Sequence, residues 1–249
     1  VHEARVLSPG HGAPPPGGPI PVLFLITTLD RGGAEKAVTR LALGLSRSKY
    51  AVHVAALQGR SGAVAADLAG ARVPVHDLGM RGKWDAGVAA RLARLLRRER
   101  IEILFAFLFH PTVVSRLVGW VCGVPIRISS ERIMDWEGWG RRLVNRWTVP
   151  LATHVVAVSD RVAAYARSAL RVPPDRLSTI PNGVDVERYL PREPRGGAGV
   201  PIIGCTARLH RKNDHASLIR AFARIAPAWP EAGLLLVGRG PEEARLRAL

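Results

Sequence analysis

The chain has 249 residues, of which 47% are hydrophobic and 22% charged, and its formal net charge is +16 at pH 7. This composition excludes a disordered chain and predicts one large or two ordinary globular domains. Most of the positive charge comes from arginine, with 32 Arg against 4 Lys, scattered over predicted helices. We interpret the arginines either as solvated helix faces or as the sign of an anionic partner: a phosphorylated substrate, an acidic membrane or nucleic acid.

Residues 1–20 lack an initiating Met and the apolar core of a signal peptide, and they are rich in Pro and Gly. We interpret them as a flexible leader without an assignable function. From residue 21, short continuous apolar runs alternate with helical patterns of about 10 to 15 residues, as in buried parallel strands joined by crossover helices. We predict strands at 21–29, 51–57, 73–78, 101–108, 125–129, 154–158 and 177–181. Residues 21–183 are therefore predicted to form one doubly wound α/β domain.

The intervals between these strands carry helical patterns, for example over residues 85–100 and 159–170. In the second of these, Ser159 or Asp160 is suited to cap the helix at its N-terminus. The pair Pro173-Pro174 then prevents the helix from continuing.

The longest apolar stretch, residues 103–126, is interrupted by a histidine, two prolines and an arginine before about 20 clean residues accumulate. We therefore predict a soluble or peripheral protein. Cys122 and Cys205 belong to no CxxC or Cys/His cluster, which favours a reducing cytoplasm.

Residues 184–199 are rich in Pro, Gly and charge without periodicity, which predicts an interdomain linker. A new βαβα pattern starts at residue 200, with two apolar runs and a helical pattern over 214–227. Two strands cannot bury both faces of a parallel sheet. We expect residues 200–249 to be the start of a larger domain.

Two adjacent glycines, Gly32 and Gly33, separate the first predicted strand from the first helix in "LDRGGAEKA". In an open α/β sheet, ligands lie beyond the carboxyl ends of the strands, and a bare turn there lets backbone N–H groups approach a phosphate. The turn matches neither GxGxxG nor GxxxxGK[ST]. A simple tight turn is the alternative interpretation.

Four segments in chain order resemble motifs of the retaining group 1 (family 4) glycosyltransferases of GT-B fold. They are "GGAEKAVTRLALGL", "VVAVSD" with "TIPNGVDVERYLP", "ARLHRKNDHASLIRAF" and "LLLVGRGP". The resemblance covers about residues 20–249 and implies two Rossmann-like domains that face each other across a cleft. The first would be the complete acceptor-side domain, and the second the truncated nucleotide-sugar-binding domain.

The resemblance implies transfer of a sugar, a hexose in our interpretation, from a nucleotide-diphosphate sugar to an acceptor hydroxyl in polysaccharide, cell-envelope or lipid-linked glycan synthesis. It implies no cofactor and no metal beyond the nucleotide sugar itself. The partners would be this donor, a sugar, polysaccharide or lipid-linked acceptor, and an anionic membrane surface. We expect a cytoplasmic protein, peripheral at the inner face of the membrane.

The departing diphosphate needs positive charge and N–H groups, and the resemblance assigns these to named residues. Arg208 would clamp the diphosphate, and the backbone of Gly32 and Gly33 would close over it. Family members carry a lysine five residues after this arginine, where this chain has Asn213, and Lys212 comes one residue early. If both lie in the first helical turn, they differ by a rotation of about 100°. We count both Lys212 and Asn213 as candidates for binding the diphosphate: either Lys212 swings its flexible stem to the phosphates, or the site relies on Arg208 and the helix amides.

Further assignments fall at the ends of the fourth and fifth predicted strands. By resemblance, His110 would contact the transferred sugar near the reacting centre and act as the catalytic residue; a packing or capping role is the alternative. Glu131 would face the acceptor, with a surface salt bridge as the alternative. Trp136 and Trp139 could stack on an acceptor or touch lipid, but ordinary packing is the interpretation we prefer.

The family also carries two glutamates separated by seven residues, and no two glutamates of this chain have that spacing. We expect this motif beyond Leu249, so the chain alone should be inactive. The first alternative function is a GT-B epimerase or phosphorylase. The second is a basic nucleic-acid-binding module, although no recognition-helix, zinc or RNA-binding aromatic signature is present. The sugar, the base and the acceptor cannot be inferred from these residues.

Overall fold

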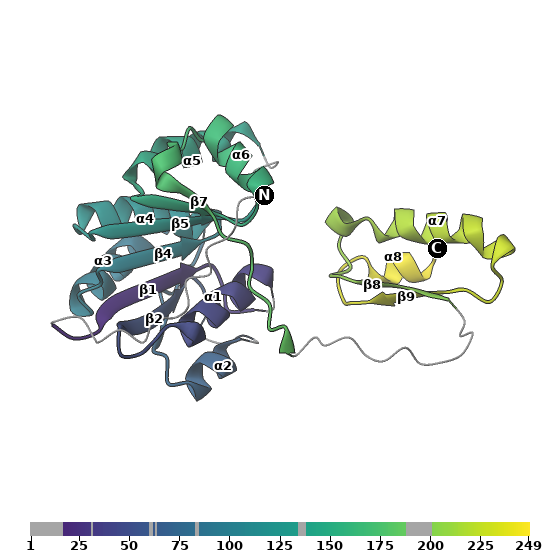
Figure 1. The fold of residues 1–249 in the computed structure, drawn as a ribbon, viewed down its shortest axis with the longest axis horizontal. Coiled ribbons are helices and arrows are strands. Elements are labelled where there is room, and N and C mark those ends of the chain that lie inside the picture. The colour runs from purple at the N-terminus through teal and green to yellow at the C-terminus, as the bar shows by residue number, and fades with distance from the viewer. Residues whose placement is uncertain are drawn as a thin grey trace. The chain divides into compact units, whose positions relative to one another are not determined.

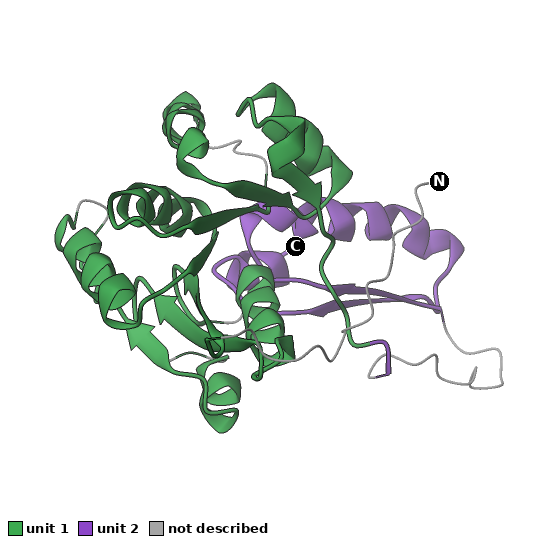
Figure 2. Ribbon diagram, turned by 60° about the vertical axis from the view of Figure 1, so that its left-hand side comes forward, with its two compact units in different colours: residues 1–185 green, residues 186–249 purple. Residues whose placement is uncertain are grey.

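The computed structural model describes most of the chain and divides it into two compact units, unit 1 over residues 1–185 and unit 2 over residues 186–249 (Figures 1 and 2). The predicted linker, 184–199, lies mostly outside the described residues, as does most of the predicted leader. The described residues are 17–30, 32–59, 62, 64–82, 85–133, 138–187 and 201–249.

Unit 1 is built on a seven-stranded sheet in the order β3-β2-β1-β4-β5-β6-β7, with every neighbouring pair parallel (Figure 1). The strands are β1 (Ile20–Ile26), β2 (Tyr50–Ala56), β3 (Val75–Asp77), β4 (Ile103–Phe107), β5 (Ile126–Glu131), β6 (His154–Ala157) and β7 (Leu177–Thr179). All seven predicted strands are confirmed, and each begins and ends within a few residues of its predicted bounds. β1 starts at Ile20, inside the predicted leader.

The helices of unit 1 occupy the intervals in which the sequence predicted them. They are α1 (Gly33–Gly44), α2 (Ala65–Gly70), α3 (Gly87–Arg98), α4 (Phe109–Val121), α5 (Trp139–Thr148) and α6 (Asp160–Ser168), with short 3-10 turns η1 (Val149–Leu151) and η2 (Pro174–Arg176). Ser159 is the N-cap of α6, and its hydroxyl accepts a hydrogen bond from the Val162 N–H at 3.3 Å. The prediction of a cap at this position is confirmed, with Ser159 as the capping residue.

The central strand β1 is buried on both faces, which explains its continuous apolar sequence. Val22, Phe24 and Ile26 pack on the face covered by α1 and α2. Leu23 and Leu25 point the other way and pack against α3 and α4. Strand periodicity therefore places each side chain from Val22 to Ile26 in one of two cores.

Unit 2 contains a parallel pair of strands, β8 (Ile202–Thr206) and β9 (Gly233–Val237). Its helices are α7 (His215–Ile225) and α8 (Glu243–Arg247), with the 3-10 turns η4 (Arg211–Asn213) and η5 (Ala226–Ala228). The predicted βαβα order is confirmed. Ile202 and Leu235 are exposed by 67% and 53%, so the small sheet leaves apolar surface in contact with water. The larger domain expected around it stays a prediction.

Within the described residues, no helix is both long enough and apolar enough to cross a bilayer. Cys122 and Cys205 are free thiols that lie in different units.

We predict that Ser159→Ala lowers the free energy of unfolding of unit 1 by about 1 kcal/mol, because the first turn of α6 loses the oxygen that accepts its N–H group. Urea denaturation followed by circular dichroism measures the change. Ser168→Ala, which removes an exposed hydroxyl bonded to the Ala164 carbonyl at the other end of the helix, is the control. It should stay within about 0.5 kcal/mol of the wild-type protein. Equal losses in the two variants would contradict the capping role.

Candidate functional site

The carboxyl edge of the unit 1 sheet collects residues that are far apart in the sequence. β1, β4 and β5 are successive neighbours in a sheet of parallel strands, so their carboxyl ends meet at one edge. α1 begins at Gly33 after β1, α4 begins at Phe109 after β4, and β5 ends at Glu131. The structure therefore places Gly33, His110 and Glu131 along the same edge of unit 1.

The two glycines of the first loop differ in their surroundings. Gly32 is the N-cap of α1 and has extended backbone, and a Cβ there would collide with the carboxylate of Glu35. A Cβ on Gly33 would meet no atom within 4 Å, and its backbone is not left-handed. A tight turn therefore does not require glycine at position 33. Neither glycine has a side chain to cover the N–H groups of the first helical turn, but the Glu35 carboxylate lies beside Gly32 and would have to turn away for an anion to approach.

His110 lies in the first turn of α4 and is half-buried, with its ring edge-on to that of Phe109 at 5.3 Å between centroids. The residue before this helix, Leu108, has φ 72° and ψ 163°. This conformation is close to a region that glycine alone occupies readily, and it is strained for leucine. Its side chain nevertheless packs against the core on the α1 face. The strained backbone of Leu108 thus fixes the junction between β4 and α4. It thereby also fixes the position of His110 in the first turn of α4.

Glu131 points into unit 1. It is 8% exposed, and its Oε1 lies 3.1 Å from Nη2 of Arg116, which is fully buried in α4. The amide nitrogen of Asn145 in α5 donates to the same oxygen at 3.4 Å. The interpretation of Glu131 as part of a surface salt bridge is therefore wrong, because the pair is internal. Its carboxylate is engaged by α4 and α5, which favours a structural role over the predicted contact with an acceptor.

Arg116 is the centre of this internal network. Its guanidinium also donates to the hydroxyls of Ser129 at 2.9 Å and Thr148 at 3.3 Å, and to the side-chain oxygen of Asn145. Burial lowers the pKa of Arg116, and the adjacent Glu131 carboxylate opposes that shift. The network connects α4, β5 and α5. His110 lies at the start of the first of these elements, α4.

Arg132, which sequence reasoning did not select, is a half-buried cation at the same edge. Its guanidinium lies over the ring of Phe107, with 5.7 Å to the centroid, and donates to the side-chain oxygen of Asn182. Burial lowers the pKa of Arg132, and the negative charge of Glu35 in α1 opposes the shift. Nothing in the sequence distinguishes this arginine from the other 31, because its role depends on burial.

In unit 2, Arg208 follows β8 and its side chain is exposed. The main-chain oxygen of Arg208 accepts a hydrogen bond from the Asn213 side-chain amide at 2.7 Å. Lys212 and Asn213 lie in the 3-10 turn η4, and α7 begins only at His215. The premise that both residues share the first helical turn is therefore wrong. Asn213 braces the Arg208 loop, which favours a structural role, and the predicted contact of Asn213 with a diphosphate stays a prediction.

The loop after β9 packs closely on the Arg208 loop. A Cβ on Gly238 would collide with the Ala207 carbonyl oxygen, and a Cβ on Gly240 with the Leu209 backbone. Main-chain hydrogen bonds from Ala207 to Val237 at 3.1 Å and from Leu209 to Arg239 at 3.0 Å join the two loops. The "VGRGP" glycines are thus explained by close backbone contact, which places Arg208 on a rigid support.

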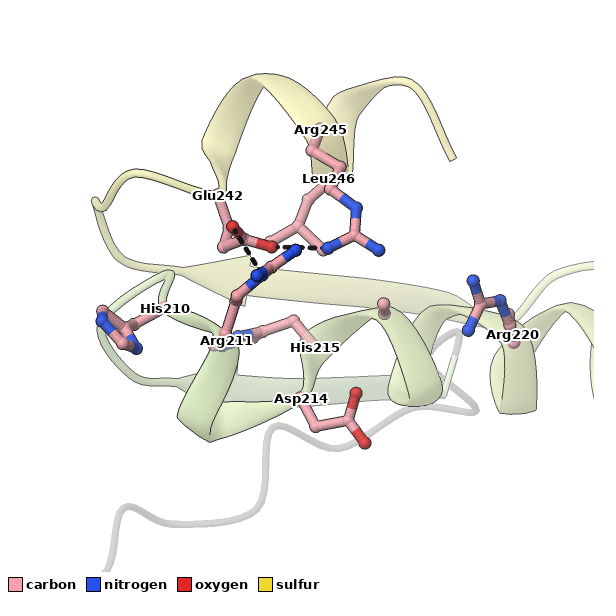
Figure 3. A pocket seen from close by; sticks show the side chains of 9 residues that line it. His210, Arg211, Asp214, His215, Arg220, Glu242, Arg245 and Leu246 are labelled. Atoms are coloured by element: carbon pink, nitrogen blue, oxygen red, sulfur yellow. Dashed lines mark hydrogen bonds and ion pairs between the residues drawn. The ribbon is translucent and has the colours of Figure 1, made fainter. Parts of the chain in front are cut away.

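A cavity of about 320 Å³ opens between the start of α7 and α8 (Figure 3). Glu242 accepts from Arg245 at 2.9 Å and lies 3.7 Å from Arg211, so two guanidinium groups converge on one carboxylate. His215 is 2% exposed, and neither ring nitrogen has a hydrogen-bond partner among the described residues. The lining residues are His210, Arg211, Asp214, His215, Ala216, Arg220, Glu242, Arg245 and Leu246. Arg208 is outside this cavity.

Residues 31–188 match the sequence profile described as Glycosyltransferase Family 4. This match covers more than half of the chain and includes the glycine loop, His110 and the crossover after β7. The chain belongs to glycosyltransferase family 4. The sequence resemblance to this family is therefore confirmed.

Several known proteins are similar to this chain. EpsF of Bacillus subtilis (strain 168) is 26% identical over 255 residues, covering 92% of this chain and 66% of EpsF. The UDP-Gal:alpha-D-GlcNAc-diphosphoundecaprenol alpha-1,3-galactosyltransferase of Escherichia coli is 24% identical over 147 residues, covering 56% of this chain and 35% of that protein. The crystal structure of Anabaena HepE in complex with UDP superposes with a TM-score of 0.74 at 19% identity, covering 92% of this chain and 64% of that one.

The likeness to HepE, together with the seven-stranded parallel sheet, confirms the predicted α/β GT-B fold class. The family 4 chain spans slightly less than two thirds of the length of EpsF and of HepE.

We predict that Glu131→Gln lowers the free energy of unfolding by about 3 to 5 kcal/mol, because it leaves the buried guanidinium of Arg116 without a counter-charge. Urea denaturation of the purified variant measures this loss. Glu243→Gln is the matched control, since Glu243 pairs with the exposed Arg247 at 3.0 Å. It should change stability by less than about 1 kcal/mol. A loss of similar size in both variants would contradict the structural role of Glu131.

Proposed function

We propose that this protein is a glycosyltransferase that moves a sugar from a nucleotide-diphosphate sugar to an acceptor hydroxyl. The observation that carries the proposal is the family 4 match over residues 31–188, which contains the bare glycine loop at the sheet edge. The UDP bound in the structure of HepE supports a nucleotide-diphosphate donor. Retention of configuration and a hexose as the transferred sugar are parts of the proposal that rest on the family alone.

During the transfer the sugar separates from the diphosphate of the donor. Groups that stabilise the negative charge on this diphosphate therefore favour the reaction. Arg208 supplies a planar guanidinium that can bond two phosphate oxygens at once. Lys212 is exposed in η4, four positions further along the chain, and can add a second charge. Within unit 1, the first-turn N–H groups of α1, beside Gly32 and Gly33, are donors suited to an anion.

His110 is the residue that we propose lies next to the transferred sugar. Its place in the first turn of α4, at the carboxyl edge, is where ligands bind in folds of this kind. Arg132, half-buried at the same edge, adds a fixed positive charge to this part of unit 1. No cofactor is proposed for the transfer, because the donor carries its own leaving group.

We further propose a cytoplasmic protein that binds the inner face of the membrane through α5. Trp139, Leu143 and Trp147 recur every fourth residue on one side of this helix and are exposed by 76%, 44% and 75%. The preference for ordinary packing of Trp139 is therefore wrong, and Trp136 lies outside the described residues. Exposed tryptophans are suited to the boundary between lipid and water.

Arginines flank this apolar stripe, which gives it the charge of a surface for anionic lipid. Arg142 follows Trp139 by three residues and Arg146 follows Leu143 by three, so each arginine lies about one helical turn from a residue of the stripe, and both line one surface hollow with Trp139 and Leu143. Arg141 lies over the Phe109 ring, 4.6 Å from its centroid. Because Phe109 precedes His110, a lipid-linked acceptor held at α5 would lie near the proposed reaction site. The diphosphoundecaprenol in the name of the Escherichia coli relative supports an acceptor of this class.

The function is tested with the protein expressed from its complete reading frame. Release of nucleoside diphosphate from UDP- and GDP-sugars is measured with and without lipid-linked and free sugar acceptors. Acceptor-dependent release supports glycosyl transfer. Conversion of the donor into its epimer without an acceptor, or turnover that depends on inorganic phosphate, would support the epimerase or phosphorylase alternative instead.

We predict that Arg208→Ala weakens the binding of UDP by about 1.5 to 3 kcal/mol, the range for hydrogen bonds to charged groups. Isothermal titration calorimetry on the expressed protein measures the change. Arg224→Ala, which removes an exposed arginine at the far end of α7, is the control and should leave UDP affinity unchanged. An unchanged affinity in Arg208→Ala would count against the clamp.

We predict that the double variant Arg142→Gln, Arg146→Gln reduces binding to vesicles that contain anionic lipid by more than tenfold, since each basic group near such a surface contributes about 1 kcal/mol. Co-sedimentation with phosphatidylcholine vesicles, with and without phosphatidylglycerol, measures the partition. Trp139→Ser with Trp147→Ser should reduce binding to both kinds of vesicle. Trp229→Ser, which removes an exposed tryptophan from unit 2, is the control. Equal binding by all variants would rule out the α5 surface.

A further inference from the structure

Two histidines and a glutamate from three different elements meet on one face of unit 1. His53 lies in β2, His76 in β3, and Glu99 follows directly after α3. One potential ligand atom from each lies within 4.8 Å of the other two, and all three residues are partly buried. His53 Nδ1 and His76 Nε2 are 3.2 Å apart. None of these residues belongs to the proposed donor or acceptor site.

The backbone explains why the side chains converge. His76 is paired with Ala55 in the parallel ladder between β2 and β3, and His53 is two residues before Ala55, so both rings stand on the same face of the sheet. Ala55 packs in the core with residues of α3, so this is the face that α3 covers. The Glu99 N–H bonds the Leu95 carbonyl at 3.0 Å, which closes the end of that helix. Regular secondary structure therefore holds all three positions.

The spacing of the nitrogen atoms suits a small transition-metal ion. Zn²⁺ binds imidazole nitrogen at about 2.0 to 2.1 Å, and a tetrahedron of that size separates its ligand atoms by about 3.3 Å. The observed 3.2 Å between His53 and His76 is close to this value. Two imidazoles with one carboxylate are ligands that zinc and its neighbours in the first transition series prefer, whereas Mg²⁺ and Ca²⁺ prefer oxygen alone.

One neighbouring charge competes with a cation at this place. The Nε and Nη2 atoms of Arg98 lie 2.8 and 2.7 Å from Oε1 of Glu99. The Arg98 side chain is 62% exposed, so it can turn into solvent, and the second oxygen of Glu99 remains available. Arg98 should therefore weaken metal binding without preventing it.

We propose that His53, His76 and Glu99 form a binding site for a divalent transition-metal ion of the zinc class, with water in the remaining coordination positions. The ion would join the three-residue edge strand β3 to β2 and to the end of α3. Since α3 runs opposite to the strands, its end lies away from the carboxyl edge that carries His110. The site is therefore one that stabilises unit 1, and it does not take part in the reaction at the carboxyl edge.

The test uses protein without a histidine tag, dialysed against chelator, and Co²⁺ as the spectroscopic probe. We expect one equivalent of Co²⁺ to bind with the strong visible absorption of low-coordinate cobalt, and Zn²⁺ to displace it. Zn²⁺ at about a hundred times its Kd should raise the melting temperature of unit 1 by roughly 5 °C. Failure of Co²⁺ and Zn²⁺ to bind stoichiometrically overturns the proposal.

Single substitutions locate the site. His53→Ala and His76→Ala should each lower the affinity for Co²⁺ at least tenfold, and Glu99→Gln several-fold. His154→Gln is the control, because His154 lies in β6 and bonds Ser178 in β7, at the opposite end of the sheet from β2 and β3. This variant should bind Co²⁺ as the wild type does. Binding that persists unchanged in His53→Ala and His76→Ala overturns the proposal.

Arg98→Gln provides a test that does not depend on removing a ligand. If the three side chains bind the ion, loss of the competing guanidinium should tighten Co²⁺ binding several-fold. If His53 and His76 are hydrogen-bonded to each other but do not bind an ion, Arg98→Gln should leave the Co²⁺ affinity unchanged. That result would count against the site. Circular dichroism in the presence of chelator verifies that each variant is folded.

Discussion

The parallel pairing of β1 with both β2 and β4 is the constraint on which unit 1 depends. A strand in this position has neighbours on both edges and helices on both faces, so its side chains from Val22 to Ile26 are buried. Each connection must also cross from one end of the sheet to the other, which brings every strand-to-helix loop to the same edge. Positions 32, 110 and 131 are brought to one edge by this rule, although about a hundred residues separate the first from the last.

A second constraint is polar and lies inside the unit. Arg116 is a fully buried cation that a carboxylate, an amide and two hydroxyls surround. Such a network adds little net stability compared with apolar packing, but each missing partner is costly, so it favours a single arrangement of the elements that it joins. Two of these elements matter for the proposed function. α4 carries His110 at its start, and α5 carries the exposed tryptophans. One internal network therefore orients both the proposed reaction site and the proposed lipid-binding face.

The strands, the helix order, the cap at Ser159 and the family could be predicted because they depend on local periodicity and on contiguous motifs. Features that depend on burial could not. A glutamate at the end of a strand looks the same in sequence whether it faces solvent or, as Glu131 does, an internal arginine. Trp139 was expected to pack and is exposed, because hydrophobicity alone does not distinguish a core position from an outer face.

Other features were missed because their residues meet only after folding. The separation of 23 positions between His53 and His76 matches no metal-binding spacing, and only the register of two parallel strands puts their rings together. The rotation of about 100° between Lys212 and Asn213 assumed that both lie in the first helical turn, but the left-handed backbone of Asp214 ends a separate 3-10 turn before α7 begins. The position that departs from the family, Asn213, has a role that the structure explains: its amide holds the main chain of Arg208.

Leu108 is subject to two opposing demands. Its backbone conformation is one that glycine adopts at little cost, whereas its side chain fills part of the apolar cluster on the α1 face. Glycine at this position would relieve the torsional strain but leave a gap in the apolar cluster. A residue branched at Cβ, such as valine or isoleucine, would fill the gap at a still higher torsional cost. In a saturation library this position should therefore accept few of the twenty amino acids, and an engineer who wishes to vary the region around His110 would do better to leave it unchanged.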